Sequence, residues 1–248
     1  MLLGLGAVVL WLAASAESGE RRPEASVAGR VVLVPVNLAV RAVAEVEPGV
    51  EPVWRAMLEY FASEYEHAIA LDRKDATALW TEVVVEARKE GRRDDLYAAY
   101  ARFARSVGEQ VEFDTIVFPT LVTLPAKLSG RVAKWDGVRR QVDIPGLFNE
   151  SIDTYREGKI WLSRHGATGE LAAASLHIAA MSPEGELRYE GRGGLVLLQE
   201  LVEPRKKTDE VELTAVMRKE PFAATDQLRE GIVAAFRGWP SASASISD

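Results

Sequence analysis

Catalysis in proteins often depends on histidine, cysteine or other reactive groups held close together, and this chain offers few such groups. His67, His165 and His177 stand apart from one another, no two of them have the i, i+4 spacing of a metal-binding pair, and cysteine is absent. A protein zinc site is therefore not expected. A thiol nucleophile and a lipid-modified cysteine are excluded as well.

Two further motifs of catalytic chemistry are missing or misplaced. No Gly-x-Ser-x-Gly elbow occurs, and Ser129 and Ser175 fall inside predicted strands. The glycine-rich run Gly191-Arg192-Gly193-Gly194 lies between two strands and not between a strand and a helix, so it lacks the geometry that cradles a phosphate. We interpret the run as a bend or bulge. The sequence predicts no catalytic, cofactor-binding or metal-binding residue, and the protein is not expected to be an enzyme.

Five residues are candidates for contact with a ligand or a partner. Asn37, Asp72 and Thr120 lie where predicted parallel strands end, and ligands of open α/β sheets gather at the carboxyl ends of such strands. A pocket in which these three converge would favour a hydrolase with a dispersed Asp, Glu and Ser site. Trp135 and Asp136 mark a predicted hairpin tip, where the indole either contacts a partner or packs on its own strands.

The elements that position these residues begin with an α/β pattern. Short β-branched or apolar runs predict strands at 30–36, 67–71 and 115–124. Apolar residues at helical spacing predict helices at 52–65, 75–91, 94–107 and 223–236. Asp75 is the expected N-cap of the second helix, and Asp94 with Asp95 is expected to open the third.

Hairpins dominate the chain after residue 124. Asp136-Gly137 is a type I′ turn signal, Pro183-Glu184-Gly185 predicts a second hairpin, and residues 143–170 are rich in turn formers and have no assigned element. The predicted fold class is α/β: a three-layer-like sheet with a β-α-β-α-α-β start, an antiparallel hairpin meander and a C-terminal helix.

Composition narrows the classes of function. The chain has 248 residues, of which 48% are hydrophobic and 27% charged, as in ordinary globular proteins. Its formal net charge is −7 and it has no long basic run, which argues against nucleic acid as a partner.

The first segment has the shape of an export signal. Residues 1–16 contain no charged side chain and end in Ala14-Ser15-Ala16, although the usual positively charged leader is absent. The apolar run is shorter than the roughly 20 residues that cross a bilayer, so we expect cleavage before Glu17 and a soluble periplasmic or secreted product. The alternative is an uncleaved membrane anchor. The expected organisation is a signal peptide (1–16), a flexible tether (17–29), a single α/β domain (30–240) and a disordered tail (241–248).

The order of elements resembles a family of exported bacterial proteins that includes the curli secretion channel lipoproteins and the amino-terminal domain of the Tol-Pal periplasmic protein B. The residues behind the resemblance are the Val-Leu-Val-Pro-Val opening strand, the helix ending near Tyr65 with 67–71 after it, Ile-Val-Phe-Pro at 116–119, and the 187–198 strand before the final helix. The resemblance implies a non-enzymatic envelope protein that binds other proteins or assembles. The chain departs from the family because it lacks the lipidation cysteine and two clear membrane-spanning hairpins, which weakens a channel role.

The sequence thus predicts an exported, non-catalytic envelope protein that acts through a protein partner or self-association. Two alternatives remain open. One is the envelope hydrolase described above, and the other is an anchored subunit of an outer-membrane secretion assembly, in which case residues 2–16 stay in the membrane.

Overall fold

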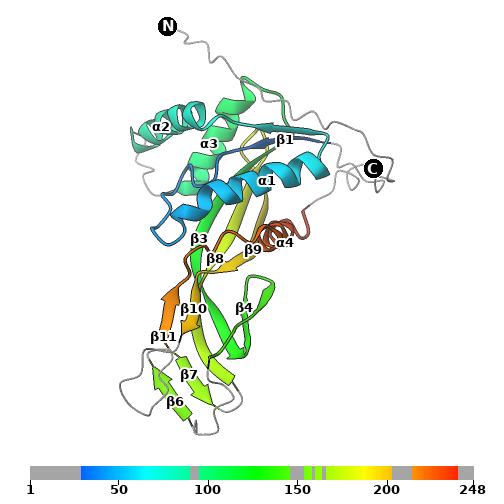
Figure 1. Cartoon of the computed structure of the whole chain (residues 1–248). Helices are drawn as coiled ribbons and strands as arrows, with labels where there is room; N and C mark the ends of the chain where they lie inside the picture. Colours follow the sequence, from blue (N-terminus) through cyan, green and yellow to red (C-terminus); the bar gives the residue numbers. More distant parts are fainter. Residues whose placement is uncertain are drawn as a thin grey trace, which may run out of the picture.

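The structure is a computed structural model that describes residues 29–89, 95–145, 154–157, 160–163, 166–202 and 214–239. One mixed sheet of nine strands runs through the molecule (Figure 1). Its strands are β1 (Arg30–Leu33), β2 (His67–Ala70), β3 (Thr115–Gly130), β4 (Val132–Trp135), β5 (Val138–Gln141), β6 (Thr154–Glu157), β7 (Ile160–Ser163), β8 (Gly166–Met181) and β9 (Leu187–Leu197). A separate two-stranded sheet pairs β10 (Gln199–Val202) with β11 (Thr214–Met217).

The sheet changes character from one edge to the other. β1 pairs in parallel with both β2 and β3, whereas β3 is antiparallel to β8 along nearly its whole length, from Ile116 opposite Met181 to Gly130 opposite Ala167. β9 and β7 pair with β8 on its other side, and β4 extends from the far half of β3 to β5. The α/β start and the antiparallel meander are therefore parts of one sheet, which confirms the predicted fold class.

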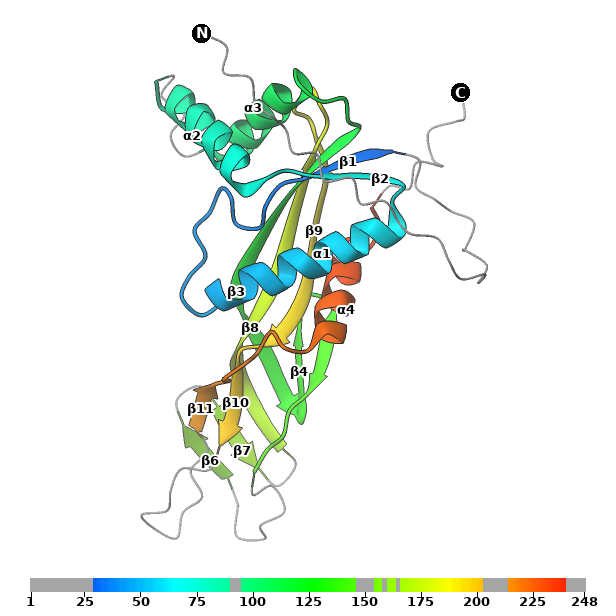
Figure 2. The same ribbon diagram turned by 45° about the horizontal axis from the view of Figure 1, so that its top comes forward.

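Helices cover both faces of the upper part of this sheet. A short 3-10 turn (Glu47–Gly49) leads into α1 (Val50–Glu64), which lies with α4 (Thr225–Ala235) on one face, while α2 (Arg73–Lys89) and α3 (Leu96–Gly108) cover the other (Figure 2). Alternating residues of β1 divide between these layers: Val31 and Leu33 face α1, and Val32 faces α2 and α3. The three-layer arrangement follows from this alternation.

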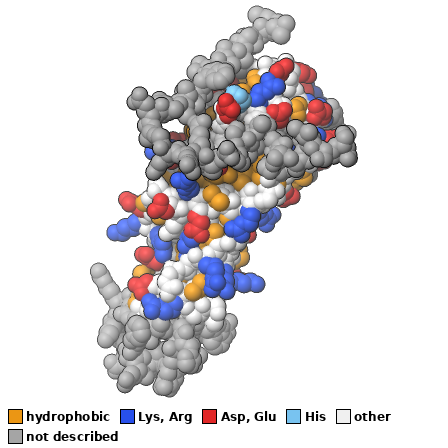
Figure 3. Space-filling model, turned by 90° about the vertical axis from the view of Figure 1, so that its right-hand side faces the viewer, with side chains coloured by type: hydrophobic (Ala, Val, Ile, Leu, Met, Phe, Trp, Pro, Cys, Tyr) orange, Lys and Arg blue, Asp and Glu red, His pale blue; other side chains and the backbone are white. Residues whose placement is uncertain are grey.

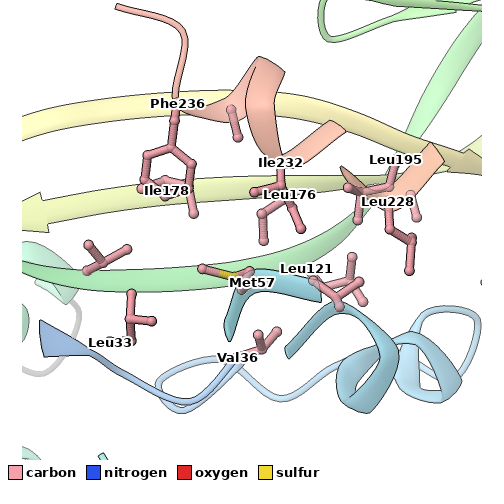
Figure 4. Close-up of a cluster of buried hydrophobic side chains, with 14 of the residues drawn as sticks. Leu33, Val36, Met57, Leu121, Leu176, Ile178, Leu195, Leu228, Ile232 and Phe236 are labelled. Carbon is pink, nitrogen blue, oxygen red and sulfur yellow. The ribbon is translucent and has the colours of Figure 1, made fainter. Parts of the chain in front are cut away.

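The core beneath α1 and α4 is apolar and fully enclosed. Met57 of α1 and Ile232 of α4 meet Leu176 of β8 there, and all three side chains are completely buried (Figure 4). Burying a side chain of this size contributes about 1.5–3 kcal/mol. This cluster fixes both helices against the sheet.

Strands β3 and β8 continue well past the helices and build a second unit, which we call the arm (Figure 1). The arm comprises residues 125–144, 166–173, 197–202 and 214–217, and it encloses its own apolar cluster, which includes Leu128, Trp135 and Leu171. Leu128 and Phe118 are an even number of residues apart in β3, so their side chains lie on the same face of the sheet. The arm cluster therefore lies on the face that α2 and α3 cover at the other end of β3. The β4–β5 hairpin folds across this face and closes it.

Several local predictions are confirmed and others are corrected. Asp95 caps α3 by accepting a hydrogen bond from the backbone amide of Ala98 at 2.9 Å, and Asp136 and Gly137 both have positive φ, as a type I′ turn requires. The cap expected at Asp75 is wrong: Asp72 accepts hydrogen bonds from the amides of Lys74 and Asp75, and α2 begins at Arg73. Asp94 lies outside the described residues, as do 1–28 and 240–248.

The glycine run in β9 is a packing site more than a bend. A Cβ atom at Gly193 would lie 2.6 Å from the backbone nitrogen of Ala235 in α4, and one at Gly194 would lie 2.6 Å from Nε1 of Trp135. The two residues thus let a helix approach one face of β9 and an indole approach the other. The predicted irregularity is also present, because the β8–β9 register shifts between Ala174 and Ser175.

Candidate functional site

A group of polar and titratable side chains gathers on the face of the sheet below α3, and we call it the polar cluster. Its members come from four elements: Tyr97 from α3, Thr120 from β3, His177 from β8, and Glu190 with Arg192 from β9. Thr120 stands directly opposite His177, which in turn stands opposite Arg192. The alternation of β8 causes this placement, because Leu176 and Ile178 turn into the core under α1 and α4 and leave His177 on the other face.

An imidazole–carboxylate pair lies at the centre of the polar cluster. Nε2 of His177 is 2.8 Å from Oε1 of Glu190, and the two side chains are 22% and 44% exposed. The hydrogen bond from His177 lowers the pKa of Glu190, and Tyr97 and Arg192 act in the same direction. Glu190 is therefore held in its ionised form by its neighbours.

Two tyrosines border the pair on the side of α3. Burial raises the pKa of Tyr97, and the hydrogen bond that it shares with Glu190 adds to the effect. Tyr100 stacks on Phe118 with ring centroids 4.2 Å apart and shares a hydrogen bond with Thr120. These contacts tie the first turns of α3 to the middle of the sheet.

The chemistry open to this arrangement is proton transfer. A histidine oriented by a carboxylate is the usual form of a general base, and Arg192 would attract an anion. Ser175 is two residues from His177 on the same strand, but its side chain is completely buried and its hydroxyl has no hydrogen-bond partner among the described residues. It is consequently not placed to act as a nucleophile on a substrate from solvent.

A groove of about 450 Å³ lies elsewhere, between α1 and the start of α4. Charges of both signs line it, including Glu51 and Arg55, which face each other at 3.5 Å, and Asp226 and Arg229 on the α4 side. Phe222 supplies apolar surface at its floor. The polar cluster contributes no residue to this groove.

Asn37, predicted at the ligand edge, has a structural role. Its φ of 59° places it in the left-handed region, and its side chain bonds the backbone of β3: Oδ1 accepts from the amide of Leu121 at 3.0 Å, and Nδ2 donates to the Leu121 carbonyl at 3.2 Å. The Asn37 side chain thus forms the two backbone hydrogen bonds that a neighbouring strand would form at this position of β3.

The other two ligand-edge residues have separate partners. Asp72 caps α2 by accepting hydrogen bonds from the backbone amides of Lys74 and Asp75. Thr120 is buried and bonds Tyr100, which makes it part of the polar cluster. The structure therefore does not join the side chains of Asn37, Asp72 and Thr120 into one site, although it places Thr120 opposite the histidine.

Trp135, one of the two predicted contact residues, is buried. Only 6% of it is exposed, and its Nε1 donates to the carbonyl of Ala174 at 3.1 Å, so the indole packs on its own sheet, the second of the two alternatives. The carbonyl of Asp136 accepts from the amide of Gly194 at 3.0 Å. These contacts fasten the hairpin turn to β9.

Sequence reasoning missed Tyr97, Glu190 and Arg192 as members of a site. Each has an ordinary position in its own element, and only the pairing of β8 with β9 and the packing of α3 bring them to His177. The one available signal was His177 itself, a polar residue between Leu176 and Ile178 that had to face away from their core.

The described residues contain no group of three or more His, Cys, Asp or Glu side chains that could hold a metal ion. Within those same ranges, no helix has both the length and the apolar character needed to span a bilayer. No protein-family model and no curated protein matches the sequence.

Proposed function

We propose that the chain is an exported protein of the cell envelope that works by contact with other proteins and not by catalysis. The observation that carries this proposal is the arm. β3 and β8 need to reach only about as far as Leu121 and Ala174 to serve the core under α1 and α4, yet β3 runs on to Gly130 and β8 extends back to Gly166. Although Ala234 and Glu230 of α4 contact the extension, most of it packs on its own hairpin beyond the helical layers, which leaves it available for another role.

The arm is built as a rigid extension. Its apolar cluster excludes water from the side that the β4–β5 hairpin covers. Arg140 of β5 forms an ion pair with Glu230 of α4 at 2.7 Å, and its guanidinium also bonds the Leu195 carbonyl. A projection that is held in one orientation presents its outer face at a small entropic cost, which favours binding.

The predicted export signal agrees with this role, although it lies outside the described residues. The absence of cysteine makes the fold independent of disulfide formation in an oxidising compartment. The partner bound by the arm can also be a second copy of this chain.

The experiment is a comparison of complex size. The full chain is expressed in a bacterial host, and envelope extract and purified chain are run by size-exclusion chromatography with light scattering. Ser129→Trp and Gln141→Trp place bulk on exposed positions of the arm, while Lys74→Trp is the matched change on α2. We expect a complex larger than one chain that the arm variants release and Lys74→Trp leaves intact. A monomer in both preparations contradicts the proposal.

Catalysis is the second candidate, and the His177–Glu190 pair is the observation that favours it. If the pair is a general base, hydrolysis of a panel of ester and phosphoester substrates should be detectable and should fall with His177→Asn, with a smaller fall for Glu190→Gln. Equal background rates for the wild type and both variants would exclude this candidate for those substrate classes.

A further inference from the structure

Three basic side chains stand in line across three neighbouring strands of the arm, and we call them the cationic row. Lys127 of β3 is directly opposite Lys134 of β4, and Lys134 is directly opposite Arg139 of β5. Residues paired in this way point to the same face of a sheet. All three are exposed, and Figure 3 shows basic side chains gathered over the lower part of the described surface.

This arrangement is unfavourable for the isolated chain. Like charges directly opposite each other destabilise an antiparallel pair, and Lys134 has such a neighbour on both sides. Within the described part of the chain, none of the three forms an ion pair. The two other arginines of this hairpin do: Arg131 with Asp143 at 3.9 Å and Arg140 with Glu230 at 2.7 Å. Lys127 also stands opposite Glu170 of β8, so the row has an acidic neighbour at one end, whereas Lys134 and Arg139 stand opposite basic residues alone in β3, β4 and β5. The row is a local concentration of positive charge on a protein whose net charge is −7.

We propose that the cationic row is a docking site for an acidic helix of another protein, with carboxylates on one face of that helix. This inference rests on the proposed function and names the chemistry of the partner. Adjacent strands lie about 4.8 Å apart, so the row is about 10 Å long. Carboxylates at positions i, i+4 and i+7 of a helix are about 4.5 to 6 Å apart along its axis and also span about 10 Å.

An extended acidic segment fits less well. Alternate side chains of a strand are about 6.6 Å apart, so three of them would span about 13 Å and run past the row. The neighbours of the row on the same face also suit a helix laid across the strands, because Ser129, Val132 and Gln141 stand opposite one another and contribute only small or polar side chains.

The surroundings of the row favour a protein over a lipid surface. Peripheral membrane helices combine basic residues with inserted Trp, Phe or Leu side chains. The outward positions next to the row hold Pro125 on one side and Ser129 and Val132 on the other, and none of these is a large apolar anchor. An anionic bilayer would in addition repel the acidic body of the protein.

The test uses two helical peptides of equal charge and composition, binding being measured by fluorescence anisotropy with the full chain. One peptide has glutamates at i, i+4 and i+7 of a single face, and the other has the same glutamates distributed around the helix. We expect the striped peptide to bind more tightly, and its affinity to fall about tenfold in Lys127→Glu/Lys134→Glu/Arg139→Glu. The control Arg41→Glu/Lys74→Glu/Arg237→Glu has the same net charge and should bind like the wild type.

Vesicles containing phosphatidylglycerol are measured in parallel. Equal affinity for the two peptides, equal effects of the two triple variants, binding to vesicles alone, or no binding to any probe would each overturn the inference. Circular dichroism confirms that both variants are folded. If the arm variants release the envelope complex while the striped peptide does not bind, the proposed function stands and the acidic-helix inference fails. If the complex is also absent, both fail.

Discussion

Replacing Gly193 with alanine should displace α4 from the sheet. The added Cβ would lie 2.6 Å from the backbone nitrogen of Ala235 and closer still to the carbonyl oxygen of Gly231. Carbon and nitrogen in contact prefer about 3.5 Å or more, so the helix has to move by about 1 Å at Ala235 and by more than that at Gly231. The obstacle is backbone on both sides, and no flexible side chain can rotate away.

The size of the effect follows from two opposing contributions. Overpacking of this kind costs up to about 3 kcal/mol. Alanine recovers about 0.5–1 kcal/mol, because glycine loses more backbone freedom than alanine on folding. The net loss is therefore about 2 kcal/mol, which for a chain of this length lowers Tm by about 4–8 °C.

The assay is urea denaturation followed by tryptophan fluorescence, with Tm from calorimetry. Gly108→Ala is the matched control, because its Cβ would lie 3.5 Å from Pro183 in an ordinary contact, and it should leave the free energy of unfolding unchanged or slightly higher. Equal stability of Gly193→Ala and the wild type would refute the packing interpretation of the glycine run and return it to a simple bend.

Three further predictions concern single side chains. Asn37→Gly keeps the left-handed backbone but loses both hydrogen bonds to Leu121, so the free energy of unfolding measured in urea should fall by about 1–2 kcal/mol. Asn37→Ala should lose about 1 kcal/mol more, because alanine is strained at this positive φ. His177 lowers the pKa of Glu190 in the folded state, so this pair stabilises the protein above the unfolded pKa of Glu190, and that stability is lost as pH falls through the folded pKa. Measured against pH, the Tm of Glu190→Gln should therefore fall less steeply in acid than the Tm of the wild type. Lys134→Gln should raise the free energy of unfolding by a few tenths to about 1 kcal/mol in low salt, and added salt should shrink the gain.

The parts of the fold that depend on local chemistry could be predicted from the sequence. Asp136-Gly137 determines its turn because both residues tolerate positive φ, and Asp95 caps α3 because a carboxylate there reaches a free amide. The cap of α2 was misplaced because Asp72 and Asp75 are equally suitable by type. Only the position of Arg73 at the start of the helix decides between them.

The length of the arm could not be predicted, and Pro125 shows why. A proline in a sheet is confined to edge strands, and the run predicted at 115–124 already contains Pro119, so the sequence alone does not say whether the strand continues past Pro125. In the structure β1 pairs with β3 only as far as Val117, and β4 begins to pair at Lys127, so β3 is an edge strand in between. A missing amide hydrogen is tolerated there, and the strand continues to Gly130.

The polar cluster was beyond sequence reasoning for a similar reason. Thr120 and His177 are 57 positions apart and meet only through the antiparallel register of β3 and β8, and Glu190 joins them through the register of β9. The sequence grouped Thr120 with Asn37 and Asp72, whose side chains have separate local partners. Strand pairing, which no local pattern encodes, decides the membership of this cluster.

Photo-crosslinking in intact cells can show whether the arm contacts another protein. A benzophenone amino acid is introduced at Gln141 on the arm or, for comparison, at Glu109 just after α3, both of which are exposed. We expect a discrete protein adduct from position 141 that is absent from position 109. Adducts from position 109 alone, or none from either position, would contradict a contact surface on the arm.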